Sequence, residues 1–193
     1  MLETPPGNRA RERTRRTILL SAITTLVGRP NASLGEVADA AGVARSTLHR
    51  YFPDREALTA ALDEFVLAEH RSALDRARPD EGTGLQAFTR IVGELLDASD
   101  VLAWWSRIDD GEVDDEADDE DDVRVAAVVA RGQRDGSVDP SFDAQWLVHL
   151  IWSALWATEL VTARGSLTRR EARDTCLRSL VKLASAPPPA PAA

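Results

Sequence analysis

The apolar residues of this chain recur every three to four positions, and glycine and proline divide it into segments of helix length. Nowhere do Val, Ile, Thr and aromatic residues alternate with polar residues for long enough to predict a strand. The pattern therefore predicts an all-α fold.

The first four predicted helices lie before a break at residues 79–84, and local chemistry marks their ends. The Ser33 hydroxyl, with Glu36 three residues later, forms a capping box, and Gly42 supplies a turn. The helices expected in this part cover residues 11–27, 33–41, 45–51 and a long segment that starts at Pro53-Asp54.

Five more helices are predicted in the remainder. Asp139 is expected to cap one of them, with Pro140 at its first position, and Thr168 with Glu171 forms a second capping box. The segment from Phe142 to Ala163 is apolar around nearly its whole circumference, so it must be covered on two sides. The helices expected here cover residues 85–98, 101–108, 123–134, 140–163 and 168–184.

Residues 109–122 form an acidic run, in which eleven of fourteen side chains are carboxylates. Repulsion at this density predicts an extended, solvated loop whose main effect is solubility. A divalent-cation site is an alternative, although the run lacks the ligand spacing of a calcium loop. Attraction of cationic ligands is a third possibility.

The net charge of -9 hides an asymmetry along the chain. Residues 1–60 carry nine arginines and six acidic residues, a net charge of +3, whereas the remainder carries -12. A basic head on an acidic body fits a nucleic-acid partner, because the body would be repelled by phosphates and would orient the head toward them.

The cysteine count and the apolar segments predict a cytoplasmic protein. Cys176 is the one cysteine, so no internal disulfide can form. The arginines before residue 18 imitate an export signal, but Arg29-Pro30 follows and no convincing cleavage site appears. Residues 146–161 contain His149 and Glu159 and fall short of about 20 residues, so no membrane span is predicted.

A helix-turn-helix is predicted between Ser33 and Tyr51. Two helices that cross steeply need a small residue at the contact and a turn that tolerates a left-handed backbone, and Ala38 and Gly42 meet these needs. The apolar positions of the motif are also filled, and the outer face of the third helix carries only donors and acceptors. The inward residues are Val37, Val43, Leu48 and Phe52.

The stretch SLGEVADAAGVARSTLHRYFPDREAL, residues 33–58, resembles the signature of the TetR (tetracycline-repressor) family of bacterial regulators almost residue for residue. Residues 132–140 are similar, in outline, to the family's approach to its last, dimer-forming pair of helices. The resemblance implies a DNA-binding domain over residues 1–53 and a helical ligand-binding and dimerisation domain over residues 54–186. The proline-rich composition of residues 187–193 predicts a disordered tail.

The resemblance also implies a function and a set of site residues. The expected protein is a repressor that binds a palindromic operator in double-stranded DNA as a homodimer and is released by a small molecule. The residues expected near base edges are Arg45, Ser46, Thr47 and Arg50. Those expected at or near phosphates are Ser33, His49, Tyr51 and Arg55.

Three positions in the motif depart from the family pattern. Ala44 stands where a serine usually caps the recognition helix, a loss of roughly 1 kcal/mol. Ser46 replaces a frequent glycine, and His49 replaces a frequent tyrosine. The operator preference therefore cannot be transferred from relatives.

The body offers candidate walls for an apolar or aromatic ligand, although large aromatic residues also build cores and interfaces. The candidate ligand residues are Phe88, Trp104, Trp105, Trp152 and Trp156. The last two helices carry more apolar surface than one body can cover, which predicts a dimer. The candidate interface residues are Trp146, Leu150, Ala154, Ala157, Leu177, Leu180 and Val181.

Two other classes of protein compete with this interpretation. An enzyme is not expected, because the three histidines are scattered along the sequence and it contains no phosphate-binding loop, nucleophile elbow or metal-ligand pair. No cofactor or metal is predicted. A helix-turn-helix-shaped interaction module without ligand control is the alternative. Arg45 and Arg50 argue against it, because such a module would show apolar residues on that face.

Overall fold

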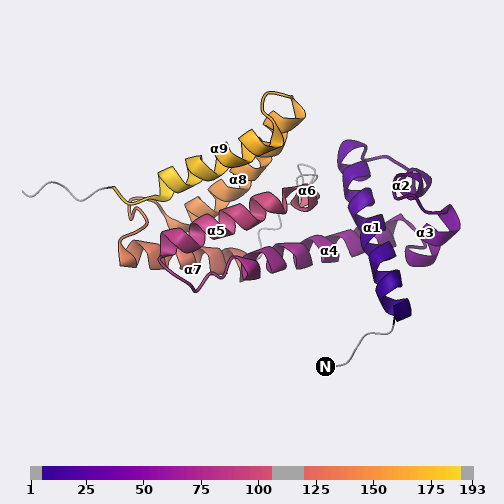
Figure 1. The fold of residues 1–193 in the computed structure, drawn as a ribbon, viewed down its shortest axis with the longest axis horizontal. Coiled ribbons are helices and arrows are strands. Elements are labelled where there is room, and N and C mark those ends of the chain that lie inside the picture. The colour runs from indigo at the N-terminus through magenta and orange to yellow at the C-terminus, as the bar shows by residue number, and fades with distance from the viewer. Residues whose placement is uncertain (1–5, 106–119, 188–193) are drawn as a thin grey trace, which may run out of the picture. The chain divides into compact units, whose positions relative to one another are not determined.

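The computed structural model describes residues 6–105 and 120–187. The elements of these residues are helices, which confirms the predicted all-α fold (Figure 1). They are α1 (Pro6–Gly28), α2 (Leu34–Ala40), α3 (Arg45–Tyr51), α4 (Arg55–Arg76), α5 (Gly84–Asp97), α6 (Ser99–Leu102), α7 (Glu120–Asp135), α8 (Ala144–Ala163) and α9 (Arg169–Ala184).

Packing divides the described residues into two units, and the division falls inside α4. The first unit comprises residues 6–69 and 100–105, and the second comprises residues 70–99 and 120–187. The domain boundary expected after residue 53 marks the end of the helix-turn-helix and stays a prediction.

The first unit gathers α2 and α3 beside α1 (Figure 1). The apolar stripe of α1 is buried, and the indole N–H of Trp104 donates to Asp63 Oδ1 of α4 over 2.7 Å. The helix-turn-helix thus rests on a common core. Its larger members are Ile18, Leu19, Ile23, Leu26, Val37, Leu48, Phe52, Leu58 and Leu62.

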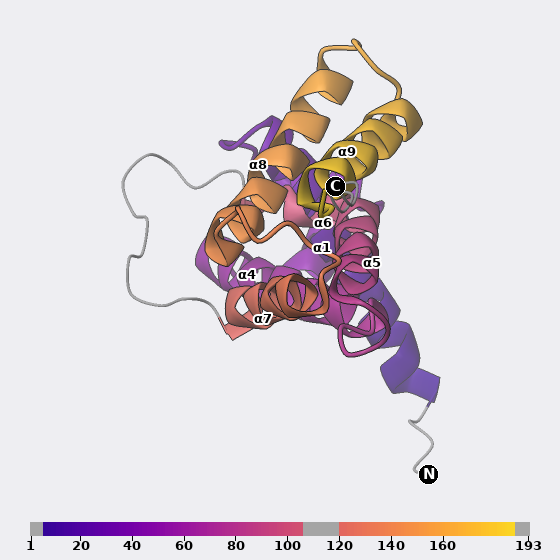
Figure 2. The ribbon, with the colours of Figure 1, turned by 90° about the vertical axis from the view of Figure 1, so that its left-hand side faces the viewer.

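In the second unit α5, α7, α8 and α9 form a four-helix arrangement in which each helix packs on two neighbours (Figure 2). The crossing of α5 and α7 requires glycine, because a methyl group on Gly84 would lie 2.1 Å from Cα of Gly132. The first backbone N–H groups of α5 donate to side chains at and just after the end of α7, Gly84 to Asp135 over 2.8 Å and Leu85 to Ser137 over 3.0 Å.

The predicted start of α8 is wrong. Asp143, not Asp139, caps this helix, and its carboxylate accepts the Trp146 N–H over 3.0 Å. The backbone of Asp139 is held elsewhere: its N–H donates to Ala184 O over 2.9 Å. Gln133 Nε2 donates to the carbonyls of Asp139 and Phe142, so this segment is a turn and the helix begins after it.

The predicted helix over residues 101–108 is also wrong, because α6 ends at Leu102. A turn follows in which the Trp104 N–H donates to the Val101 carbonyl over 3.2 Å. Residues 106–108 lie outside the described residues, as do residues 188–193 of the expected tail.

The acidic run departs from the expected loop at its end. Residues 120–122 form the first turn of α7, where negative side chains interact favourably with the helix dipole, and Asp121 is 2% exposed. Residues 109–119 lie outside the described residues.

The length argument against a membrane span fails, because α8 has 20 residues and is apolar enough to cross a membrane by length and composition alone. In the second unit, however, α8 packs on α7 and α9. Its buried residues are Leu147, Val148, Ile151, Leu155 and Thr158. One such helix is weak evidence for a membrane protein.

Candidate nucleic-acid interface and ligand site

Ser33 opens α2 as predicted, through a capping box with Glu36. The Ser33 hydroxyl accepts the Glu36 N–H over 3.3 Å, and Glu36 Oε2 accepts the Ser33 N–H over 2.8 Å. The pKa of Glu36 lies below its usual value because it accepts from the Ser33 backbone, then from the Ser33 hydroxyl, and then from Arg29. The cap uses the Ser33 side chain, which stays exposed.

The turn and the third helix follow the predicted motif. Gly42 has φ +66°, and the Val43 N–H donates to the Ala38 carbonyl over 3.0 Å. Leu48 is buried in the first unit, so the opposite face of α3 meets solvent. Exposed on this face are Arg45, Ser46, His49 and Arg50, with Thr47 half-buried beside them.

The start of α3 lacks a side-chain cap, as Ala44 predicts. Arg45 follows at the first helical position, and its guanidinium lies over the first turn of α2. A methyl group on Gly35 would come within 3.0 Å of Arg45 Cζ. Glycine at position 35 therefore makes room for the arginine.

His49 contacts the backbone beyond α3. Its Nδ1 lies 3.1 Å from the Pro53 carbonyl oxygen, which can only accept, so Nδ1 carries a proton. This leaves Nε2 as the ring nitrogen for a further contact.

Tyr51 connects α3 to α1. Its hydroxyl donates to the Arg11 carbonyl over 3.2 Å. The guanidinium carbons of Arg11 and Arg50 lie 5.8 Å and 5.9 Å from the centre of the Tyr51 ring, within the range of cation–π attraction. The ring therefore holds two cations, from two helices, close together.

Arg55 is occupied by the backbone before α2. Its Nη1 donates to the Ala32 carbonyl over 2.7 Å, and its Nη2 donates to the Pro30 carbonyl. The sequence-based role at phosphates stays a prediction, and the observed contacts are those of a residue that positions the loop.

The candidate ligand aromatics are divided between the two units. Trp104 and Trp105 belong to the first unit, whereas Phe88 is fully buried in the core of the second. Trp156 is 58% exposed on α8. Trp152 adjoins a polar cluster of the second unit.

That cluster was missed by the sequence interpretation. The Trp152 indole N–H donates to Asp122 Oδ1 over 3.3 Å, and its ring centre lies 5.2 Å from that of His70, which is 1% exposed. Asp121 accepts from Arg71 Nε over 3.2 Å and from Arg124 Nη1 over 3.1 Å. A signal was present, because Asp121 precedes Val125 by four residues and Val128 by seven, on one face of a helix.

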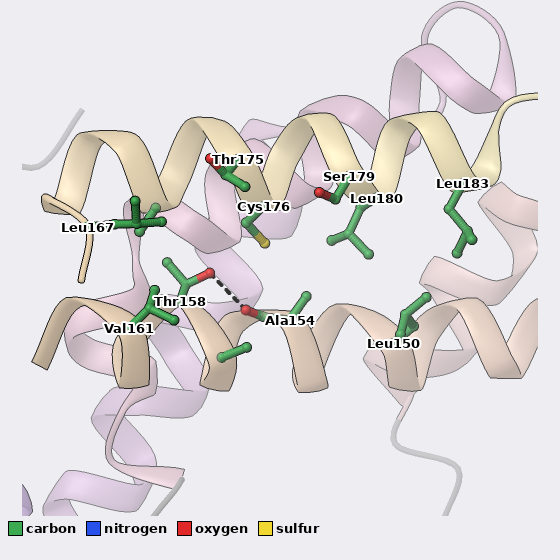
Figure 3. Close-up of a pocket in the computed structure, with 12 residues that line it drawn as sticks. Leu150, Ala154, Thr158, Val161, Leu167, Thr175, Cys176, Ser179, Leu180 and Leu183 are labelled. Atoms are coloured by element: carbon green, nitrogen blue, oxygen red, sulfur yellow. Dashed lines mark hydrogen bonds between the residues drawn. The ribbon is translucent and has the colours of Figure 1, made fainter. Parts of the chain in front are cut away.

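A groove of about 390 Å³ lies between α8 and α9, and side chains of both helices point into it (Figure 3). Thr158 lies in it, with its hydroxyl on the Ala154 carbonyl over 2.8 Å, and burial raises the pKa of the Cys176 thiol. Four candidate interface residues line the groove, and Leu177 and Val181 are half-buried on α9. The four are Leu150, Ala154, Ala157 and Leu180.

Residues 26–62 match the family model "Bacterial regulatory proteins, tetR family". The HTH-type transcriptional repressor LfrR of Mycolicibacterium smegmatis is 34% identical over 171 residues, which is 89% of this chain and 90% of LfrR.

Solved structures agree with this match. The structure of the TetR-like regulator LfrR from Mycobacterium smegmatis in complex with proflavine aligns with a TM-score of 0.65 and 29% identity, over 90% of this chain and 97% of that one. A TetR-family regulator from Rhodococcus sp. has the same fold at 18% identity, with a TM-score of 0.65 over 89% of this chain and 98% of that one.

The relatives are transcription regulators and not enzymes, and the motif that the family model matches contains α2 and α3 with their exposed arginines. A relative that is 34% identical over most of both chains, and whose fold and helix-turn-helix also agree, shows which family the chain belongs to. The chain belongs to the TetR family of bacterial transcription regulators.

Proposed function

We propose that the chain is a cytoplasmic repressor that binds a palindromic operator as a homodimer and leaves it when a planar aromatic ligand enters the body. The observation that carries the proposal is the exposed face of α3. There Arg45 and Arg50 flank Ser46 and Thr47, a combination suited to base edges in the major groove. Repression is proposed because LfrR is a repressor.

The homodimer is supported by the uncovered apolar surface of α8 and α9. Trp146 and Trp156 are each 58% exposed, and the groove between the helices is lined mainly by aliphatic side chains. A surface of this kind usually marks an interface. A second copy would supply the same helices, and two-fold symmetry would give the two half-sites of a palindrome.

A ligand in the body is supported by Trp152 and by the relative whose structure holds proflavine, a planar aromatic compound. The Trp152 ring would stack on such a ligand, and the carboxylates at the start of α7 favour a cation. We therefore place planar aromatic cations first among the ligands to test. The alternative, an interaction module without ligand control, predicts no response to any of them.

The test is selection of bound duplexes from a random pool, followed by ligand competition. We expect one enriched site with two-fold symmetry, and saturable quenching of tryptophan fluorescence by proflavine with matching loss of site affinity. Trp152→Phe should reduce the ligand effect and leave DNA binding of the free protein unchanged. If the selection enriches no sequence, the proposal that the protein reads DNA bases is contradicted. Quenching of fluorescence without loss of DNA affinity would contradict ligand release.

A further inference from the structure

The arginines of α1 lie on two faces of the helix. Arg11 and Arg15 are four residues apart, and their guanidiniums lie over the Tyr51 and Phe52 rings, at 5.8 Å and 5.9 Å from the ring centres. Arg9, Arg13 and Arg16, with Glu12, border a shallow hollow on another side. The same helix thus presents one set of cations to the end of α3 and another set elsewhere.

The first set is continuous with the candidate base-reading surface. Arg11 is exposed, and its backbone carbonyl accepts the Tyr51 hydroxyl. Arg50 lies on the same ring, so two guanidiniums from helices far apart in sequence share one aromatic support. Like charges so placed repel each other in the free protein and both gain from a nearby phosphate.

Several other cations of α1 are less suited to this role. Arg16 pairs with Glu69 of α4 and lies over the Phe65 ring. Arg15 is half-buried against Phe52. The Arg13 side chain is exposed and makes no hydrogen bond or ion pair with the described residues, but it projects about 200° around the helix from Arg11.

We propose that the first turns of α1 are a second DNA-contacting element, in which Arg11, supported by Tyr51 beside Arg50, binds a backbone phosphate outside the bases that α3 reads. The inference rests on the proposed DNA reading and adds a residue and an element to it. The chemistry is a guanidinium on a phosphate, so the contact is independent of base sequence.

Arg13 makes a matched control, because Arg13→Ala removes the same charge from the same helix. We expect Arg11→Ala to weaken binding several-fold on both the selected site and random duplex, and to lower the slope of log Kd against log salt by about one. Arg13→Ala should change both affinities less than about twofold. Arg11→Gln, which keeps the stem on the Tyr51 ring, replaces Arg11→Ala if thermal melts show that the alanine variant is unfolded.

Ethylation interference gives a second readout. With wild-type protein, ethylation of one phosphate per half-site should block binding, and the Arg11 variant should be insensitive to that ethylation while remaining sensitive at the others. Equal losses of DNA affinity for Arg11→Ala and Arg13→Ala would mean that only the net charge of the helix matters, which would overturn the proposal. An Arg11 variant that binds DNA like the wild type would also overturn it. If the wild-type protein binds all duplexes equally and Arg11→Ala still weakens that binding, the result would contradict base reading by α3 and support the phosphate contact of Arg11.

Discussion

Arg55 Nη1, in the first turn of α4, donates a hydrogen bond of 2.7 Å to the backbone carbonyl of Ala32, one residue before the cap of α2. The same guanidinium also contacts the Pro30 carbonyl. One side chain therefore satisfies two carbonyls of the loop that delivers Ser33. A planar fork with several donors holds both acceptors in a fixed geometry, which the shorter, flexible ammonium of a lysine does not provide.

Replacement of Arg55 separates positioning from phosphate binding. Arg55→Ala and Arg55→Lys should both lower the free energy of unfolding by about 1 to 2 kcal/mol, since both lose the paired hydrogen bonds. Lysine should restore little of the DNA affinity that alanine loses. Urea unfolding and binding to random duplex measure the two effects. Full rescue by lysine would show that Arg55 acts as a point charge on a phosphate.

The uncapped start of α3 can be improved. Ala44→Ser should raise the free energy of unfolding by about 1 kcal/mol, because a serine at this extended position can accept an N–H of the first turn. The control is Ala127→Ser, an exposed position inside α7, where serine should be neutral or destabilise by up to about 0.5 kcal/mol. Thermal melts that move equally for the two variants would contradict the capping argument.

The capping box at α9 predicts an acid-dependent stability. The pKa of Glu171 is lowered from its usual 4.5 because its carboxylate accepts from the Thr168 hydroxyl and then from the Thr168 backbone N–H. A lowered folded-state pKa stabilises the protein above pH 4.5, and this contribution is lost as the pH falls through the folded value. Glu171→Gln should therefore show a shallower loss of stability below about pH 5 in urea titrations. Identical pH profiles would contradict this account of the cap.

The dimer predicted from α8 and α9 is tested by Ala157→Glu. This exposed alanine lines the groove, so a carboxylate there would be buried and unpaired between two copies. Sedimentation should show a wild-type particle of roughly twice the 21.0 kDa chain mass and a monomeric variant. Ala127→Glu, on the exposed side of α7, should remain dimeric. A monomeric wild type that still binds the selected site would refute the interface.

The sequence predicts well those features that nearby residues determine. The starts of α2 and α9 follow from Ser33 with Glu36 and from Thr168 with Glu171, and Leu48 determines which face of α3 is buried. The start of α8 could not be predicted, because Asp139 is a plausible cap until its N–H pairs with Ala184, far along the chain.

The same distinction holds for the candidate site. The exposed donors of α3 could be read from helical spacing, whereas the contact of Tyr51 with Arg11 joins residues 40 positions apart. Asp121 was assigned to a solvated run because its charge was considered without Arg71, 50 residues earlier in the chain. Charge density alone could not distinguish a buried, paired carboxylate from its exposed neighbours.

The central claim is that α3 reads bases, and the affinity of Arg45→Ala and Arg50→Ala for the selected site and for random duplex tests it most directly. Each substitution should cost about 1 to 3 kcal/mol on the selected site, and little on random DNA at the same salt. Thermal melts confirm that the variants are folded. If both substitutions lower the two affinities by equal factors, these arginines bind only the phosphate backbone and the claim is wrong.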